Sequence, residues 1–225
     1  MAASKMTMEC MLNREYVKAG SKAELHLAVD ISPPSAPPAP QVPEIVKPLN
    51  VSLTIDRSGS MREENKIENA KLAALQLIQS LKPTDYVSLI TFADKAQVDV
   101  NARPASDFSY FQHAISSIKA NGLTDIYAAL KASFDEAAYV SRGIWGTDRP
   151  VSRIILLTDG EPTKGKDKVA DFIDLCSQYG ISVTALGLGS DYNEELLSAI
   201  ASHSGGVWYH ITDPTSLPDV FREEL

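Results

Sequence analysis

Residues 49–61 read LNVSLTIDRSGSM, and this stretch decides the fold class of the chain. Its first seven residues have the composition of a strand, with valine, leucine, isoleucine and threonine. Oxygen-bearing side chains then follow at Asp56, Ser58 and Ser60. Alternate residues of an extended segment point to the same side. The spacing therefore predicts three oxygens directed at one point just beyond the end of a strand.

Two further loops carry side chains of the same kind. Residues 154–160 read IILLTDG, an apolar run that ends in Asp159 and Gly160. Between the two acidic loops lies the stretch GLTD, residues 122–125, which contains Thr124. Hydroxyl and carboxylate oxygens that converge on one point are ligands for a hard divalent cation. The sequence thus predicts a metal site, with Mg²⁺ as the expected ion.

From residue 49 onward, strand patterns alternate with helix patterns. Strands are expected at 51–55, 86–93, 97–100, 151–158, 181–187 and 206–210, and helices at 66–81, 106–118, 124–139, 166–178, 194–202 and 215–224. This alternation predicts an α/β fold: a doubly wound, mostly parallel sheet flanked by helices on both faces. Ligands of such sheets bind beyond the carboxyl ends of the strands, near the topological switch point. Asp56 and Asp159 both follow strands, so both are expected at that edge.

The first 48 residues have a different composition. Residues 1–31 are predicted to form a β-hairpin appendage with its turn near residues 19–21. Residues 32–48 are a proline-rich linker, because proline at this density sustains neither a helix nor a strand ladder; residues 49–225 form the α/β domain. A two-stranded ribbon alone is marginally stable. We therefore expect the hairpin to dock on its own domain or to pair with a neighbour; the alternative is that it awaits strands absent from a fragment.

The charge balance narrows the possible partners. Asp and Glu number 29 against 21 Lys and Arg, and the net charge of −8 argues against binding to nucleic acid or to anionic membranes. No run of about 18 apolar residues is present, so no membrane span is predicted. The N-terminus lacks the apolar segment of a signal peptide, and Cys10 and Cys176 form no disulfide framework. The expected location is the cytoplasm, with secretion left open for a processed or trimmed N-terminus.

The three motif parts together resemble the metal-ion-dependent adhesion site (MIDAS) of von Willebrand factor type A (vWA) domains, over roughly residues 46–225. The resemblance implies that Ser58, Ser60 and Thr124 are hydroxyl ligands of Mg²⁺, with Mn²⁺ and Ca²⁺ as the other candidates. Asp56 and Asp159 would act directly or through water. An open sixth position would take an Asp or Glu carboxylate from a partner protein.

Elementary electrostatics agrees with this chemistry. Two carboxylates crowded together without a cation repel each other, and the pKa of one of them rises. A bound divalent ion removes that cost. Because neutral hydroxyls cancel less of the ion's charge than carboxylates would, the ion keeps enough positive character to attract an anionic group.

Three residues near the motifs are candidates for contact with a partner. Asp125 follows Thr124 at a position where small or neutral residues are common in the family; its preferred interpretation is a cap of the helix that begins at residue 126. Glu161 follows the second acidic loop, and solvated loop charge is its simpler interpretation. Trp145 lies in an expected exposed loop. Exposed aromatic side chains favour interfaces, although packing onto its own domain is the alternative.

The sequence therefore predicts a non-catalytic protein-interaction module that depends on a divalent metal ion. It contains no G-x-S-x-G nucleophile motif and no P-loop, so no enzymatic activity is expected. Two alternatives stay open: a vWA subunit of an ATPase-linked chaperone or metal-insertion complex, and a structural domain with a vestigial, empty site. The motifs name neither the partner nor the oligomeric state.

Overall fold

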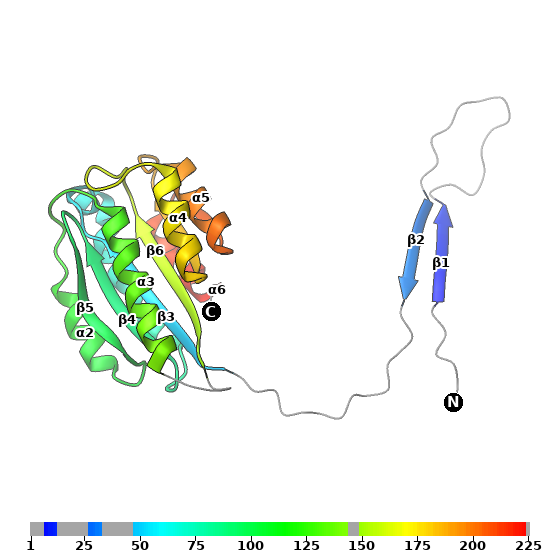
Figure 1. Cartoon of the computed structure of the whole chain (residues 1–225), viewed down its shortest axis with the longest axis horizontal. Helices are drawn as coiled ribbons and strands as arrows, with labels where there is room; N and C mark the ends of the chain where they lie inside the picture. The colour runs from blue at the N-terminus through cyan, green and yellow to red at the C-terminus, as the bar shows by residue number, and fades with distance from the viewer. Residues whose placement is uncertain (1–6, 13–26, 33–46, 144–148, 224–225) are drawn as a thin grey trace. The chain divides into compact units, whose positions relative to one another are not determined.

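The computed structural model of the chain divides into two compact units, Met1–Val46 and Lys47–Leu225 (Figure 1). The structure describes residues 7–12, 27–32, 47–143 and 149–223. Trp145, a candidate for contact with a partner, lies outside the described residues. In the first unit, β1 (Thr7–Leu12) pairs antiparallel with β2 (Leu27–Ser32). The register runs from Thr7 opposite Ser32 to Leu12 opposite Leu27, so the N-terminal segment contains the expected two-stranded ribbon.

The second unit contains a six-stranded sheet in the order β5-β4-β3-β6-β7-β8. Its strands are β3 (Leu49–Asp56), β4 (Tyr86–Phe92), β5 (Ala96–Pro104), β6 (Val151–Thr158), β7 (Ser182–Leu188) and β8 (Trp208–Ile211). All neighbouring pairs are parallel except β4 with β5. The chain proceeds from β3 outward to β5 and then returns to β6 on the other side of β3. The topological switch point therefore lies between β3 and β6.

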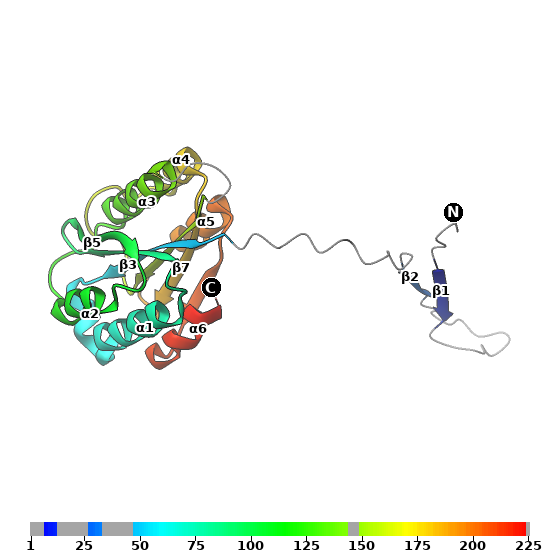
Figure 2. The same ribbon diagram turned by 90° about the horizontal axis from the view of Figure 1, so that it is seen from below.

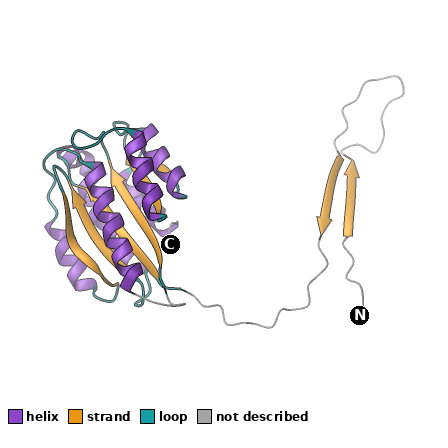
Figure 3. Cartoon of the chain, viewed as in Figure 1, coloured by secondary structure: helices purple, strands orange, loops and turns teal. Residues whose placement is uncertain are grey.

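Helices cover both faces of this sheet (Figures 2 and 3). They are α1 (Lys66–Ser80), α2 (Phe108–Ser117), α3 (Ile126–Gly143), α4 (Val169–Tyr179), α5 (Glu194–Ser204) and α6 (Leu217–Glu223), with short 3₁₀ segments η1 (Gly59–Asn65) and η2 (Pro214–Ser216). One apolar core joins the sheet to α1, α2 and α6, and the other joins it to α3, α4 and α5. None of the helices in the described part of the chain is long and apolar enough to cross a membrane. The expected fold class, a mostly parallel sheet between two helical layers, is confirmed.

The alternation of side chains along β3 explains how the site is positioned. Val51, Leu53 and Ile55 point into the core beneath α1, whereas the residues between them are polar and equally buried. On that opposite side, Asn50 donates through Nδ2 to the Ala137 carbonyl of α3 at 3.1 Å, and Thr54 Oγ1 lies 2.6 Å from Ser133 Oγ. Hydrogen bonds therefore offset most of the cost of burying these groups, although Asn50 Oδ1 has no hydrogen-bond partner. Asp56 ends this row of buried polar residues.

Four expected helices begin two or three residues later in the structure than the sequence pattern indicated, at Phe108, Ile126, Val169 and Leu217. The helix expected from residue 124 begins at Ile126, because the Asp125 carboxylate accepts a hydrogen bond from the Ala128 amide at 2.9 Å. This contact has the geometry of an N-cap, and it leaves Thr124 in the preceding loop. The helix expected from residue 166 begins at Val169.

Candidate functional site

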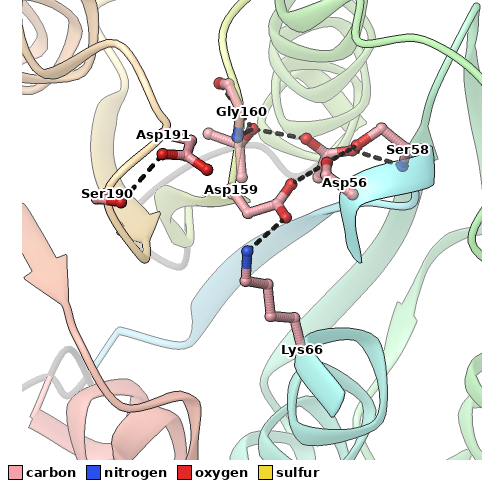
Figure 4. A network of polar contacts seen from close by, with 9 residues as sticks. Asp56, Ser58, Lys66, Asp159, Gly160, Ser190 and Asp191 are labelled. Carbon is pink, nitrogen blue, oxygen red and sulfur yellow. Dashed lines mark hydrogen bonds and ion pairs between the residues drawn. The ribbon is translucent and has the colours of Figure 1, made fainter. Parts of the chain in front are cut away.

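The site lies at the carboxyl ends of β3 and β6, on the two sides of the switch point (Figure 4). Asp56 is the last residue of β3, and Asp159 directly follows Thr158, the last residue of β6. The exposed fractions of these two aspartates are 0% and 1%. Parallel pairing of β3 with β6 holds both strand ends at one edge of the sheet. Open α/β sheets bind their ligands in a crevice beyond the carboxyl ends of the strands, at the topological switch point.

The Asp56 carboxylate is fully hydrogen-bonded within the protein. Oδ1 accepts from the Ser58 amide at 2.7 Å, and Oδ2 accepts from the Thr158 hydroxyl at 2.6 Å. Burial raises the pKa of Asp56 from 3.8 to about 6, although these hydrogen bonds act in the opposite direction and the charge of Asp159 adds a small increase. This group therefore gains from any positive charge brought to the site.

Ser58, Ser60 and Asp159 form a short chain of contacts. The Ser60 hydroxyl donates to Asp159 Oδ1 at 2.7 Å, and Ser58 Oγ lies 3.2 Å from Ser60 Oγ. A hydroxyl that donates a hydrogen bond to a carboxylate still has lone pairs that can bind a metal ion. Neighbouring oxygens of an octahedral shell lie about 3.0 Å apart around Mg²⁺ and about 3.4 Å apart around Ca²⁺. The distance between the two serine oxygens lies between these values and fits both ions.

The serine loop is tied to the loop that carries Thr124. The Gly59 amide donates to the Gly122 carbonyl at 3.0 Å, and the Asn121 amide donates to the Arg57 carbonyl at 2.7 Å. Gly122 has a φ of +94°, and a Cβ there would lie 2.4 Å from Asp94 Oδ2. Glycine is thus required at this turn. The backbone contacts fix the first two loops relative to each other.

Gly160 keeps open the space between the two loops. A Cβ at this position would lie 3.9 Å from both Ser60 Oγ and Thr124 Oγ1. The side chain of a larger residue would therefore occupy the region that these hydroxyls border. The Thr124 backbone is fixed from the other side, because its amide donates to Thr163 Oγ1 at 2.9 Å and its carbonyl accepts from the Thr163 amide at 3.0 Å. The structure thus brings together all five predicted metal-site residues.

Lys66, which the sequence interpretation overlooked, joins the same group. Its Nζ donates to Asp159 Oδ2 at 3.0 Å, and only 6% of the residue is exposed (Figure 4). The sequence contained a signal for this position: Lys66 stands four residues before Ala70 and eleven before Leu77, on the buried stripe of α1. A lysine on such a stripe needs a partner, because an unpaired buried charge is costly.

Two of the candidate contact residues, Asp125 and Glu161, stand next to site loops in the sequence. Asp125 is half-buried and caps α3, and Glu161 is exposed beside Gly160. Glu63 and Glu64 are exposed on η1. In the described part of the chain, no group of three or more His, Cys, Asp or Glu side chains is arranged to hold a metal ion. The donor set at the switch point differs, because it consists of two carboxylates and three hydroxyls, the oxygen ligands that hard cations prefer.

Comparison with known proteins identifies the family. Residues 50–223 match the von Willebrand factor type A domain, and the chain belongs to this family. It is 35% identical over 177 residues to the uncharacterized protein sll0103 of Synechocystis sp., an alignment that covers 78% of this chain and 40% of that protein. The chain therefore spans less than half the length of this curated relative.

Solved structures of vWA proteins share the fold. A von Willebrand factor type A protein from Catenulispora acidiphila superposes with a TM-score of 0.68 at 22% identity, covering 97% of this chain and 48% of that one. Proximal thread matrix protein 1 from the mussel byssus, in a form with a zinc-occupied MIDAS motif, gives a TM-score of 0.63 at 16% identity. That comparison covers 79% of this chain and 47% of the mussel chain.

Proposed function

We propose that the chain is a divalent-metal-dependent protein-interaction module, and that the MIDAS of its family is the site described above. The observation that carries the proposal is the meeting of three hydroxyls with two buried carboxylates at the switch point. Family membership supports it. The mussel neighbour, described with zinc at its MIDAS, supports the idea that this fold can hold a metal ion at the corresponding place.

The residues have separate roles in this proposal. Ser58, Ser60 and Thr124 offer neutral oxygens to the ion. Asp159 orients the Ser60 hydroxyl by accepting a hydrogen bond from it, and Asp56 holds the serine loop by accepting a hydrogen bond from the Ser58 amide. The bound ion supplies a Lewis-acidic position for an anionic ligand. We propose Mg²⁺ as the physiological ion, with Mn²⁺ and Ca²⁺ as alternatives, since the spacing of the serine oxygens fits six-coordinate hard cations.

The ligand in this proposal is an Asp or Glu carboxylate of a partner protein, bound without catalysis. Glu161 is exposed beside the site, and the chain carries a net charge of −8. An acidic partner surface would be repelled by this charge, so we propose a partner whose carboxylate projects from a neutral or basic surface. Asp125 and Glu161 remain the proposed contact residues around the ion. Trp145 is not retained, because its segment joins the end of α3 to the amino end of β6, whereas the site lies at the carboxyl ends of the strands.

The metal is tested by thermal unfolding in chelator and in millimolar Mg²⁺, Mn²⁺ or Ca²⁺. A ligand that binds only the folded state raises the melting temperature, so we expect a higher midpoint with metal. The variant Ser58→Ala/Ser60→Ala should lose most of this increase, because it removes two ligands. Ser116→Ala, an exposed serine on α2, is the matched control. Equal midpoints with and without metal in the wild-type chain, together with no heat of binding by calorimetry, would refute the proposal.

Partner binding is tested by capture from an extract in Mg²⁺ and in chelator. A partner recovered only with Mg²⁺ is then measured over a salt series. Affinity for the proposed neutral surface should change little with salt, and affinity for a basic surface should fall as salt screens its attraction to the acidic chain. If the partner binds equally well in chelator, its recognition does not depend on the metal ion. Metal-dependent turnover of phosphate or ester substrates that Ser58→Ala abolishes would contradict the non-catalytic role.

A further inference from the structure

The Lys66–Asp159 ion pair is more deeply buried than the pairs that Lys71, Arg103, Lys131, Lys164 and Lys166 form with carboxylates. The side chains of the two residues are 7% and 0% exposed, and the lysine Nζ lies 3.0 Å from Asp159 Oδ2. The lysine rises from the first turn of α1 toward the aspartate (Figure 4). Gly189 lies beside this side chain, since a Cβ at that position would be in ordinary contact with Nζ, at 3.6 Å.

Both oxygens of Asp159 are engaged. Oδ2 accepts from Lys66, and Oδ1 accepts from the Ser60 hydroxyl at 2.7 Å. A carboxylate held in this way is directed toward its two donors. It is not free to turn and enclose a cation with both oxygens, as a bidentate ligand would.

We infer that Lys66 is a positioning residue that weakens metal binding at this site in exchange for stronger binding of an anionic ligand to the metal-loaded protein. The inference rests on the proposed function and adds a determinant of selectivity to it. It follows from the charges that the fold encloses. Asp56 and Asp159 carry two negative charges, which a divalent ion alone would cancel; Lys66 contributes one more positive charge, and the loaded site is left with a net charge of +1.

The two effects have opposite signs and can be measured separately. Lys66 repels an incoming cation, so removal of its charge should increase metal affinity by at least about tenfold, the value for a divalent ion and a unit charge about 6 Å apart in a medium with the dielectric constant of water. The same removal leaves the loaded site neutral, so a carboxylate should bind the loaded protein several-fold more weakly. Removing the lysine also leaves Asp159 buried without its cation, which is destabilising. The metal-free variant should therefore melt lower than the metal-free wild type.

The experiment compares Lys66→Met and Lys66→Gln with the wild-type chain. Mn²⁺ affinity is measured by calorimetry, and the melting temperature is measured in chelator and in Mn²⁺. Acetate is the carboxylate probe: its displacement of Mn²⁺-bound water is followed by water-proton relaxation, with chloride at equal ionic strength as the reference. Lys71→Met is the matched control, because Lys71 is on the same helix and pairs with the exposed Glu68 at 2.8 Å.

Both Lys66 variants should bind Mn²⁺ more tightly, show a larger metal-induced increase in melting temperature, and respond less to acetate, while Lys71→Met should behave as wild type. Glutamine removes the charge but keeps a hydrogen-bond donor, on a side chain one atom shorter. Wild-type metal and acetate binding in Lys66→Gln would therefore overturn the inference, even if Lys66→Met were unstable. If the wild type binds Mn²⁺ and both variants bind it with the same affinity, the inference is refuted but the metal site is still supported. No Mn²⁺ binding to any of the proteins would refute the proposed function itself.

Discussion

Asp56 shows how burial and hydrogen bonding compete at a single carboxyl group. Two donors, the Ser58 amide and the Thr158 hydroxyl, favour its ionised form. Desolvation at the end of β3 disfavours that form more strongly, and the pKa rises to about 6. A group of this kind is destabilising when ionised alone and becomes favourable only when a cation approaches. The residue is therefore suited to a site that is filled by a metal ion.

We predict that metal-free protein loses stability as the pH rises from about 4 to about 6. The folded-state pKa of Asp56 lies above the unfolded value of 3.8, so the folded state binds more protons in this window. Its contribution is complete below pH 4 and is lost as the pH passes through about 6. The change should be on the order of 2–3 kcal/mol in the free energy of unfolding. Denaturant unfolding in chelator across this pH range measures it.

The matching variant is Asp56→Asn, which cannot ionise. Because its side chain has no ionisable group, its stability should not show this decrease. The variant should keep the fold, since the Thr158 hydroxyl can turn to accept a hydrogen bond from the new amide. Asp174→Asn, on the exposed side of α4, should retain the decrease. The same pH dependence in Asp56→Asn and in the wild type would assign the effect to another group.

The sequence predicted the helices and strands correctly where the hydrophobic residues follow a clear periodic pattern. β3 and β6 are nearly continuous buried strands, and both were recognisable from apolar runs that end in oxygen-bearing loops. β5 was predicted only over residues 97–100, whereas it spans Ala96–Pro104. It is an edge strand with exposed polar residues and a shift of register opposite β4, so its hydrophobic pattern is weak.

The predicted site followed from motif spacing, but Lys66 did not. Asp56, Ser58 and Ser60 stand close in sequence, so the motif was enough to group them. The expected reason, alternation along an extended segment, is wrong for Ser60, because β3 ends at Asp56 and Ser60 lies in η1. Lys66 reaches Asp159 across 93 residues of sequence, and no local pattern specifies that contact. Only the three-dimensional packing of α1 beneath the ends of β6 and β7 brings the two together. The capping role of Asp125 was predictable, because an Asp directly before a helical pattern is a local signal.

A glycine between α5 and β8 should be among the positions most sensitive to substitution. A Cβ on Gly206 would lie 2.2 Å from the Val183 carbonyl oxygen of β7, and backbone atoms cannot move aside cheaply. We expect Gly206→Ala to cost about 3 kcal/mol or more in the free energy of unfolding. Thermal or denaturant unfolding of the purified variant measures this.

Gly180→Ala is the control for that prediction. Gly180 ends α4 with a φ of +62°, and no neighbouring atom lies within 4 Å of the place that a Cβ would take there. The substitution should cost only about 1 kcal/mol, from the left-handed backbone conformation. If the two substitutions cost the same free energy of unfolding, the close approach of Gly206 to Val183 does not constrain the fold.

At the scale of the whole molecule, the division at residues 46 and 47 makes the vWA unit a self-contained fold. Among the residues that the structure describes, those of its two apolar cores all belong to the second unit. We predict that residues 47–225 alone will fold and will show the same increase in melting temperature with Mg²⁺ as the full chain. Circular dichroism melting in Mg²⁺ and in chelator measures both properties.

The same fragment tests the expected docking or pairing of the N-terminal ribbon. If the ribbon docks on its own domain, its removal should lower the melting temperature. If it pairs with a neighbour, the mass by light scattering should decrease to that of a monomer. A fragment that equals the full chain in both properties would show that the ribbon contributes to neither.

The position of β3 at the centre of the sheet also has a consequence for biosynthesis. Asn50 of β3 is paired with Tyr86 of β4 and with Ser152 of β6. One edge of β3 can therefore be covered early, while its other edge waits for a segment about a hundred residues downstream. A ribosome adding roughly 5–20 residues per second needs several seconds to supply that segment. Throughout this interval the nascent chain presents an unpaired apolar strand, which is the kind of surface that chaperones bind. A ribosome that stalls in this interval would leave a product prone to aggregate.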